Sequence, residues 1–344
     1  FLGLTEQWRG DPLECPLWLF PTAKRRMQAE PFVAPDVQAQ RLAVLYASAA
    51  SSQAKIIVAP AQAVMEKVLP RRHCMDASRY LVVREEIQRE ELISHLVAIG
   101  YYQTDLVEEV GDLSIRGDII DLYTPLYPQP LRLEFFDEVL ESLRFFSPAS
   151  QRSSDNLDDV IIVPAHEVLL TPSRQQRAAA WFAEALAEES RLRSDLELWQ
   201  ERVKGSGHFP GIEQLLPLYY DRLETLFDYL PQSTLVVQSN SGSIKKTVVE
   251  LFEQVNRDRD AAHQNSRWTL SPEMYLLDEK ELNRSLDSYP QIFHSSLPVE
   301  HASDKETSEV LHFRLGDHRG LQQKIQDHQQ RQRLLEPLAQ RLQQ

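Results

Sequence analysis

The alternation of apolar and polar residues from Leu131 to Phe146 constrains the fold of this chain more than any other feature. Its first half reads Leu-Arg-Leu-Glu-Phe-Phe, and its second half reads Val-Leu-Glu-Ser-Leu-Arg-Phe-Phe. A period of two is typical of a strand that buries one face. Asp137 and Glu138, between the halves, fit a hairpin turn. We therefore predict two antiparallel strands joined by that turn.

The outward face of this hairpin carries arginine and aromatic side chains, although a face exposed to water is expected to carry simple polar residues. Alternation turns one set inward, namely Leu131, Leu133, Phe135, Leu143 and Phe145. The outward set is Arg132, Glu134, Phe136, Arg144 and Phe146. Arginine beside an aromatic on a polar face has the composition of an interface hot spot. The alternative is a helix covering Phe136, and Arg116, at the end of the preceding Leu-Ser-Ile-Arg strand, favours the interface.

The hairpin belongs to a predicted α+β unit that begins near Arg79. A strand at 79–84 and a helix at 90–100 precede the strands, and Gly100 is a natural residue to follow the helix. From Arg79 to His166 there are seven Lys and Arg against seventeen Asp and Glu. Such a surface repels nucleic acid, so its few arginines are expected to meet a protein partner.

The segments on both sides of this unit predict a parallel α/β sheet. Before it we expect buried strands at 17–20 and 55–59, and helices at 22–28, 36–47 and 61–69, with Thr22 and Asp36 as candidate N-caps. After it we expect helices between 171 and 200, a compact apolar stretch at 211–231, a buried strand at 234–238, a helix at 244–264 and a strand–helix–strand pattern at 274–295. The resumption of α/β character indicates one domain split by the insert.

Composition narrows the class of protein. A length of 344 residues suggests two or three domains, and the net charge of −14 disfavours duplex DNA binding. No apolar run is long enough to span a membrane, and the first residues lack a signal-peptide pattern. Cys15 and Cys74 leave a disulfide open, although two distant cysteines favour a reduced, cytoplasmic protein.

A search for catalytic motifs finds no competitor to the hairpin face. The chain has no Gly-Lys dipeptide, and Gly242–Thr247 resembles a phosphate-binding loop only loosely, so an ordinary helix start is favoured. Asp137-Glu138 could imitate an acidic magnesium motif, but a hairpin turn is the better interpretation. His166-Glu167 lacks the second histidine of a zinc site, and we predict no metal, no nucleotide site and no catalytic residue.

Several segments together resemble the N-terminal region of the bacterial transcription-repair coupling factor family. They occur in the family's order and lie at 100–123, 131–153, 160–172 and 209–231. The resemblance covers most of residues 36–297. It implies an α/β fold of the UvrB type, with a degenerate P-loop (RecA-like) parallel-sheet domain in two pieces, 1–76 and 167–297. It also implies an inserted α+β UvrA-binding domain at 77–166, and a linker with the first helix of a following domain at 298–344.

The resemblance also implies a function. In this family the module is a non-catalytic adaptor that recruits UvrA to stalled RNA polymerase during nucleotide excision repair. The family's UvrA-contacting residues fall on Arg116, Arg132 and Phe136. RNA polymerase, DNA, ATP and magnesium belong to other parts of the full-length family protein, whose motor the module is also expected to restrain. No cofactor is expected here.

Two further points follow from the family pattern. The alternative is UvrB itself, an ATP-dependent damage-recognition protein, which is disfavoured by the missing Gly-Lys-[Ser/Thr] and by the lack of an aromatic DNA-clamping hairpin. The sequence also departs from the family near 5–6 and 28–29, where members carry longer segments. Either this is a shortened relative or residues are missing at those positions, and the chain resembles a fragment that ends just inside the next domain.

Overall fold

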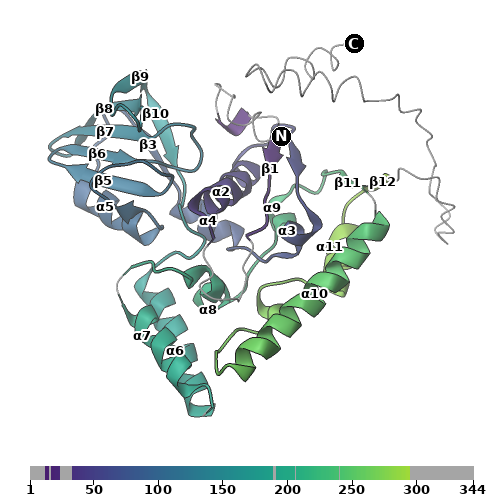
Figure 1. The fold of residues 1–344 in the computed structure, drawn as a ribbon. Helices are drawn as coiled ribbons and strands as arrows, with labels where there is room; N and C mark the ends of the chain where they lie inside the picture. Colours follow the sequence, from purple (N-terminus) through teal and green to yellow (C-terminus); the bar gives the residue numbers. More distant parts are fainter. Residues whose placement is uncertain are drawn as a thin grey trace.

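The computed structural model describes residues 12–14, 17–23, 33–188, 191–205, 207–239 and 241–294 (Figure 1). Several expectations lie outside these residues: most of the helix at 22–28, Cys15, the positions near 5–6 and 28–29, the linker and the glutamine-rich tail. Cys74 is buried and free, and burial raises the pKa of its thiol to about 12.

A six-stranded sheet forms the left-hand lobe of Figure 1, with strand order β4-β5-β6-β7-β8-β9. Its strands are β4 (Tyr102–Gln103), β5 (Asp112–Arg116), β6 (Ile119–Leu122), β7 (Leu131–Phe136), β8 (Val139–Phe146) and β9 (Ser153–Leu157). All neighbours are antiparallel except β4 and β5. Helix α5 (Arg89–Ala98) belongs to the same lobe, and the predicted hairpin is confirmed as β7 and β8.

Two strands at the base of this lobe carry the chain in and out of it. They are β3 (Arg79–Val82) and β10 (Asp159–Ile162), which pair antiparallel with Arg79 opposite Ile162. The entry and exit points of the insert are therefore adjacent.

The segments on either side contain two parallel strand pairs and most of the helices. Before the insert lie η1 (Pro12–Glu14), β1 (Leu17–Leu19), α2 (Pro35–Ala50), β2 (Ile56–Val58), α3 (Ala61–Met65) and α4 (Arg71–Ala77). After it lie α6 (Pro172–Glu188), α7 (Arg193–Lys204), η2 (Ile212–Leu215), α8 (Leu216–Tyr219), α9 (Leu226–Tyr229), β11 (Val236–Ser239), α10 (Ser241–Gln264), η3 (Pro272–Met274), α11 (Glu279–Asp287) and β12 (Gln291–His294). β1 pairs with β2, and β11 with β12, both in parallel. The chain is thus α/β, with parallel strands outside the insert.

Some local predictions are wrong. Asp36 is in the first turn of α2 and is not its N-cap, a position that Ala34 occupies next to Pro35. The strand at 55–59 is not buried, because Ile56 is 65% exposed, and the strand near 234–238 exposes Val237. The helix expected at 61–69 ends at Met65, because the following residues form bridges with distant segments instead of a further turn.

Arg41, on α2, is completely buried and joins four parts of the chain. Its Nη1 atom lies 2.7 Å from Glu66 Oε2, and its Nε atom lies 2.9 Å from Glu167 Oε1. It also donates to the carbonyl of Pro21 at 2.8 Å and lies over the ring of Phe20, 4.4 Å from its centroid. The two carboxylates hold the pKa of Arg41 above its ordinary value despite burial, which alone would lower it.

Gly100 follows the C-cap of α5 and packs against the chain that leaves the insert. It has a φ of +103°, and the amides of Gly100 and Tyr101 donate to the carbonyls of Val97 and Leu96 in a Schellman motif. A Cβ at Gly100 would lie 2.3 Å from the Cβ of His166. The predicted role of Gly100 is therefore confirmed, and the packing against His166 is an additional constraint.

Arg41→Met should lower the free energy of unfolding by about 3–5 kcal/mol, because it removes the charged hydrogen bonds that Arg41 donates to the buried carboxylates of Glu66 and Glu167. Urea unfolding followed by circular dichroism measures the change. Arg72→Met is the control, since its ion pair with Asp76 is exposed and should contribute less than about 1 kcal/mol. Equal losses in the two variants would contradict the role given to Arg41.

Gly100→Ala should lower the free energy of unfolding by about 2–4 kcal/mol. Alanine is strained at this positive φ, and its Cβ would also clash with His166. Gly117→Ala is matched to it, because Gly117 also has a positive φ, of +58°, but no atom lies within 4 Å of an added Cβ. We expect Gly117→Ala to lower the free energy of unfolding by only about 1–2 kcal/mol. Thermal denaturation of both variants separates the clash from the backbone strain.

Candidate docking face

The three residues selected from the sequence lie on two strands of the six-stranded sheet. Arg116 ends β5, whereas Arg132 and Phe136 are on β7, and β6 runs between the two strands. Phe136 is 68% exposed, so the alternative in which a helix covers it is wrong. It precedes the β7–β8 turn, where Asp137 adopts a φ of +54°.

Asp121, on β6, joins Arg116 to Arg132. Its carboxylate is 1% exposed and accepts from both guanidinium groups. Arg116 Nη2 lies 2.6 Å from Oδ2, while Arg132 Nε lies 2.8 Å from Oδ1 and its Nη2 lies 2.8 Å from Oδ2. The antiparallel register accounts for the second contact, because Asp121 and Arg132 are direct partners across β6 and β7. The sheet therefore brings the two arginines together on a single carboxylate.

Arg132 is largely enclosed. Its side chain is 14% exposed, and its guanidinium lies over the ring of Phe146, 4.8 Å from the centroid. Its Nη1 atom also lies 3.4 Å from the carbonyl of Gln151 and 3.4 Å from Ser153 Oγ. The hydrogen bonds to Asp121 raise the pKa of Arg132 above its ordinary value. Arg132 is thus fixed on several sides.

Arg116 is more accessible, with its side chain 49% exposed. The turn that follows it is held from two directions. Arg89, on α5, donates to the carbonyl of Gly117, and the amide of Phe135 donates to the carbonyl of Asp118 at 2.9 Å. Arg116 therefore projects from a fixed backbone, and Asp121 sets the direction of its side chain.

The outward face differs from the prediction at Phe146. The alternation places it outward, but it is completely buried, because Arg132 lies over its ring and the loop that carries Gln151 reaches the same guanidinium. Glu134 and Arg144 are outward and half-buried, as expected, and form an ion pair. Glu134 therefore neutralises Arg144, whereas Arg116 and Arg132 share the one carboxylate of Asp121.

Sequence reasoning did not identify Asp121. The signal was present, because a lone acid interrupts the apolar strand Ile119–Leu122 at an alternating position. A buried acid requires a partner. Its assignment to both arginines depended on the strand register, which the sequence alone did not provide.

The other candidate motifs have structural roles in the described part of the chain. Gly242 to Thr247 form the start of α10, as the alternative interpretation held. Asp137 and Glu138 form the hairpin turn between β7 and β8. His166 accepts from the amide of Val168 at 2.9 Å, and its ring lies 4.7 Å from that of His208. Within the described residues, no group of three His, Cys, Asp or Glu is arranged to hold a metal ion.

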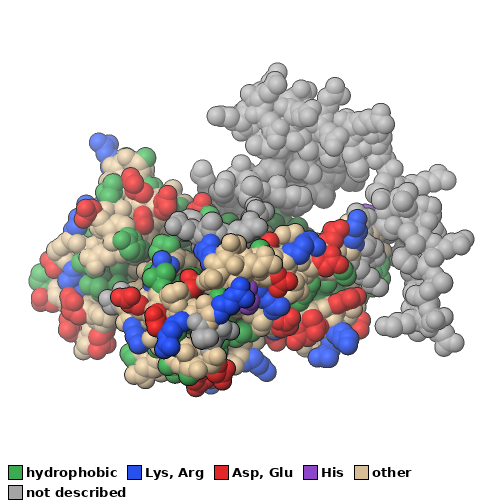
Figure 2. Space-filling view, turned by 60° about the horizontal axis from the view of Figure 1, so that its bottom comes forward, with side chains coloured by type: hydrophobic (Ala, Val, Ile, Leu, Met, Phe, Trp, Pro, Cys, Tyr) green, Lys and Arg blue, Asp and Glu red, His purple; other side chains and the backbone are tan. Residues whose placement is uncertain are grey.

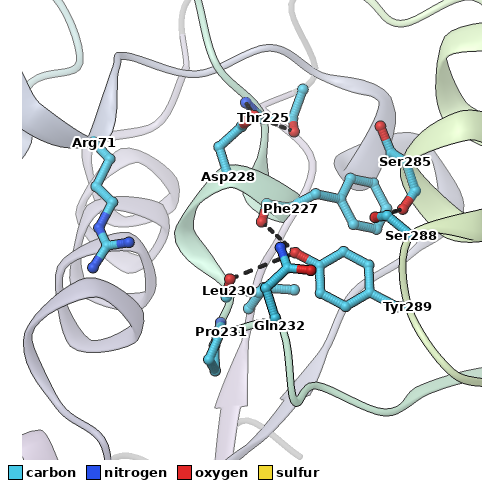
Figure 3. A pocket seen from close by; sticks show the side chains of 10 residues that line it. All are labelled: Arg71, Thr225, Phe227, Asp228, Leu230, Pro231, Gln232, Ser285, Ser288 and Tyr289. Carbon is cyan, nitrogen blue, oxygen red and sulfur yellow. Dashed lines mark hydrogen bonds between the residues drawn. The ribbon is translucent and has the colours of Figure 1, made fainter.

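A hollow of about 440 Å³ lies where α9 meets the end of α11 (Figure 3). Some of its polar groups bind each other: Asp228 accepts from the Thr225 amide at 2.8 Å, and Tyr289 donates to the carbonyl of Phe227 at 2.7 Å. Ser288 donates to the carbonyl of Ser285 at 2.6 Å.

The segment that carries the docking face is acidic in composition. Figure 2 shows red side chains gathered at the left of the molecule, on the side of the six-stranded sheet. The stretch 79–166 has the excess of Asp and Glu described above. None of the described helices has the length and apolar character needed to cross a membrane.

Comparisons with known proteins find relatives both for the insert and for the chain around it. Residues 80–168 match the family described as the UvrB interaction domain. A transcription-repair-coupling factor of Myxococcus xanthus is 32% identical over 90% of this chain, and those of Escherichia coli and Haemophilus influenzae are 29% identical over 81% and 75%. The chain is homologous to the transcription-repair-coupling factors. The match supports the N-terminal UvrB-like module predicted from the sequence.

The chain spans only about a quarter of these relatives, since it covers 26%, 24% and 22% of their lengths. The activities and partners of a whole transcription-repair-coupling factor therefore do not follow for this chain from the match. The division at residues 76–77, 166–167 and 297–298 and the roles of Arg116, Arg132 and Phe136 stay predictions.

The three site residues should differ in their effects on stability. Arg132→Ala should lower the free energy of unfolding by about 2–4 kcal/mol, because it removes two charged hydrogen bonds from a buried carboxylate. Arg116→Ala should cost about 0.5–1 kcal/mol, and Phe136→Ala less than about 0.5 kcal/mol, since both side chains reach solvent. Denaturant unfolding of the three variants gives the order, and a large loss for Phe136→Ala would contradict its exposure.

Proposed function

We propose that this chain is a non-catalytic adaptor that binds UvrA through the six-stranded sheet. It would thereby recruit UvrA to RNA polymerase stalled at DNA damage. Contacts to RNA polymerase and DNA would be made by other parts of a full-length transcription-repair coupling factor. The homology to these factors and the match to the UvrB interaction domain support the proposal.

The observation that carries the proposal is the exposure of Phe136 on a face with ordered arginines. An exposed phenylalanine on a strand surface is costly to solvate and contributes binding energy once a partner covers it. Aromatic and arginine side chains at fixed positions lose little conformational entropy on binding. The face therefore suits a protein partner.

Charge indicates the character of that partner. Two guanidinium groups share the single carboxylate of Asp121, which leaves one net positive charge at this point of the face. The surrounding segment is acidic and would repel a phosphate backbone. A carboxylate beside an apolar surface would complement Arg116 and Phe136. A protein surface can present a carboxylate beside an apolar patch, whereas the phosphate backbone of a nucleic acid cannot.

Binding of purified UvrA to this chain tests the proposal directly. Phe136→Ala and Arg116→Ala should each weaken binding by about 1–4 kcal/mol, which is a factor of about 5 to 1,000 in Kd. Calorimetric titration, or fluorescence anisotropy of the labelled chain, measures the affinities. Each variant is tested well below its unfolding transition.

Matched controls exist elsewhere on the chain. Phe293, on β12, is 56% exposed, and the side chain of Arg177 is 48% exposed and paired with Asp221. Phe293→Ala and Arg177→Ala should bind UvrA like the parent. The proposal fails if the parent chain does not bind UvrA, or if the site variants lose no more affinity than these controls.

A further inference from the structure

Asp121 is buried, yet it is bound to two side chains on the face of the sheet that carries Phe136. Within the described residues, Asp121 is the partner recorded for the guanidinium of Arg116, at 2.6 Å. Arg132 has additional contacts with Phe146, Gln151 and Ser153. Loss of the Asp121 carboxylate would therefore free Arg116 more completely than Arg132.

The contact leaves Arg116 able to bind a second carboxylate. The guanidinium has five N–H donors, and the contact with Asp121 uses the Nη2 end. Half of the side chain reaches solvent. An arginine held at one end presents its other donors in one orientation, and this reduces the entropy lost when a partner carboxylate binds.

We propose that Asp121 is a positioning residue of the docking face, which orients Arg116 toward an acidic side chain of the partner. This inference rests on the proposed UvrA-binding function and assigns a role that the exposed residues alone do not indicate. In this arrangement Phe136 makes the apolar contact with the partner and Arg116 makes the charged contact. Asp121 orients the guanidinium of Arg116 for that contact.

Asp121 also forms an ion pair with the largely buried Arg132, so its loss could weaken the fold as well as misorient Arg116. A lower UvrA affinity of Asp121→Asn would not by itself distinguish these two causes. A double-mutant cycle separates them, because an effect transmitted through Arg116 disappears when Arg116 is absent. The cycle consists of the parent, Asp121→Asn, Arg116→Ala and the double variant, each titrated with UvrA below its melting transition. Asparagine keeps the size of the side chain and one acceptor oxygen but removes the charge.

Asp121→Asn should weaken UvrA binding about tenfold in the parent, and by less than about twofold when Arg116 is already alanine. Asp221→Asn is the control, because Asp221 pairs with an equally exposed arginine, Arg177, outside the sheet. It should leave binding unchanged. An equal loss from Asp121→Asn in both backgrounds, or no loss in either, would overturn the positioning role.

Arg116→Lys provides a second test that leaves Asp121 intact, for the case in which Asp121→Asn does not fold. Lysine keeps the charge but lacks the planar fork. It should bind UvrA nearly as weakly as Arg116→Ala, and parent-like binding would overturn the inference. If the parent chain itself does not bind UvrA, the proposed function fails, and this result is distinct from parent binding without coupling between Asp121 and Arg116.

Discussion

The buried cation Arg41 makes polar contacts with segments on both sides of the insert. Arg41 lies on α2, and its contacts are Phe20 and Pro21 after β1, Glu66 after α3, and Glu167 just after the insert. A buried ion pair of this kind adds little net stability compared with a well-packed apolar group of the same size. It does, however, disfavour any arrangement in which one of the carboxylates loses its partner. Arg41 therefore helps to specify where the chain returns beside α2 after about 90 residues of insert, in addition to the apolar core that the two segments share.

The sequence predicted those parts of the fold that local patterns determine. Alternation predicted the β7–β8 hairpin and the exposure of Phe136, and glycine placement predicted the end of α5. The errors occurred where tertiary contacts replace local preference. The helix expected at 61–69 ends at Met65, because Glu66 and Val68 form backbone bridges with distant segments instead of a further turn. Phe146 is buried on the outward side because Arg132 covers it.

At the docking face, too, the sequence indicated which residues matter but not how they contact each other. Composition and period placed Arg132 and Phe136 on the outward face, and the family resemblance implied the set of Arg116, Arg132 and Phe136. Neither could indicate that the two arginines share one carboxylate or that Arg132 is mostly enclosed. Both facts depend on which residues lie opposite each other in the sheet, and a register is a property of paired strands. Lone acids in apolar strands are a useful signal for such pairings, because a buried carboxylate requires compensation.

The pairing of β3 with β10 has a consequence for how this architecture tolerates change. Because Arg79 and Ile162 are opposite each other, the chain leaves the surrounding domain and rejoins it at almost the same point in space. Removing the insert would leave two ends that a very short link could close, at little cost in loop entropy. Conversely, the insert has ends that can be grafted onto an adjacent pair of residues elsewhere. An attachment of this kind suits the insert to transfer between host domains as one unit.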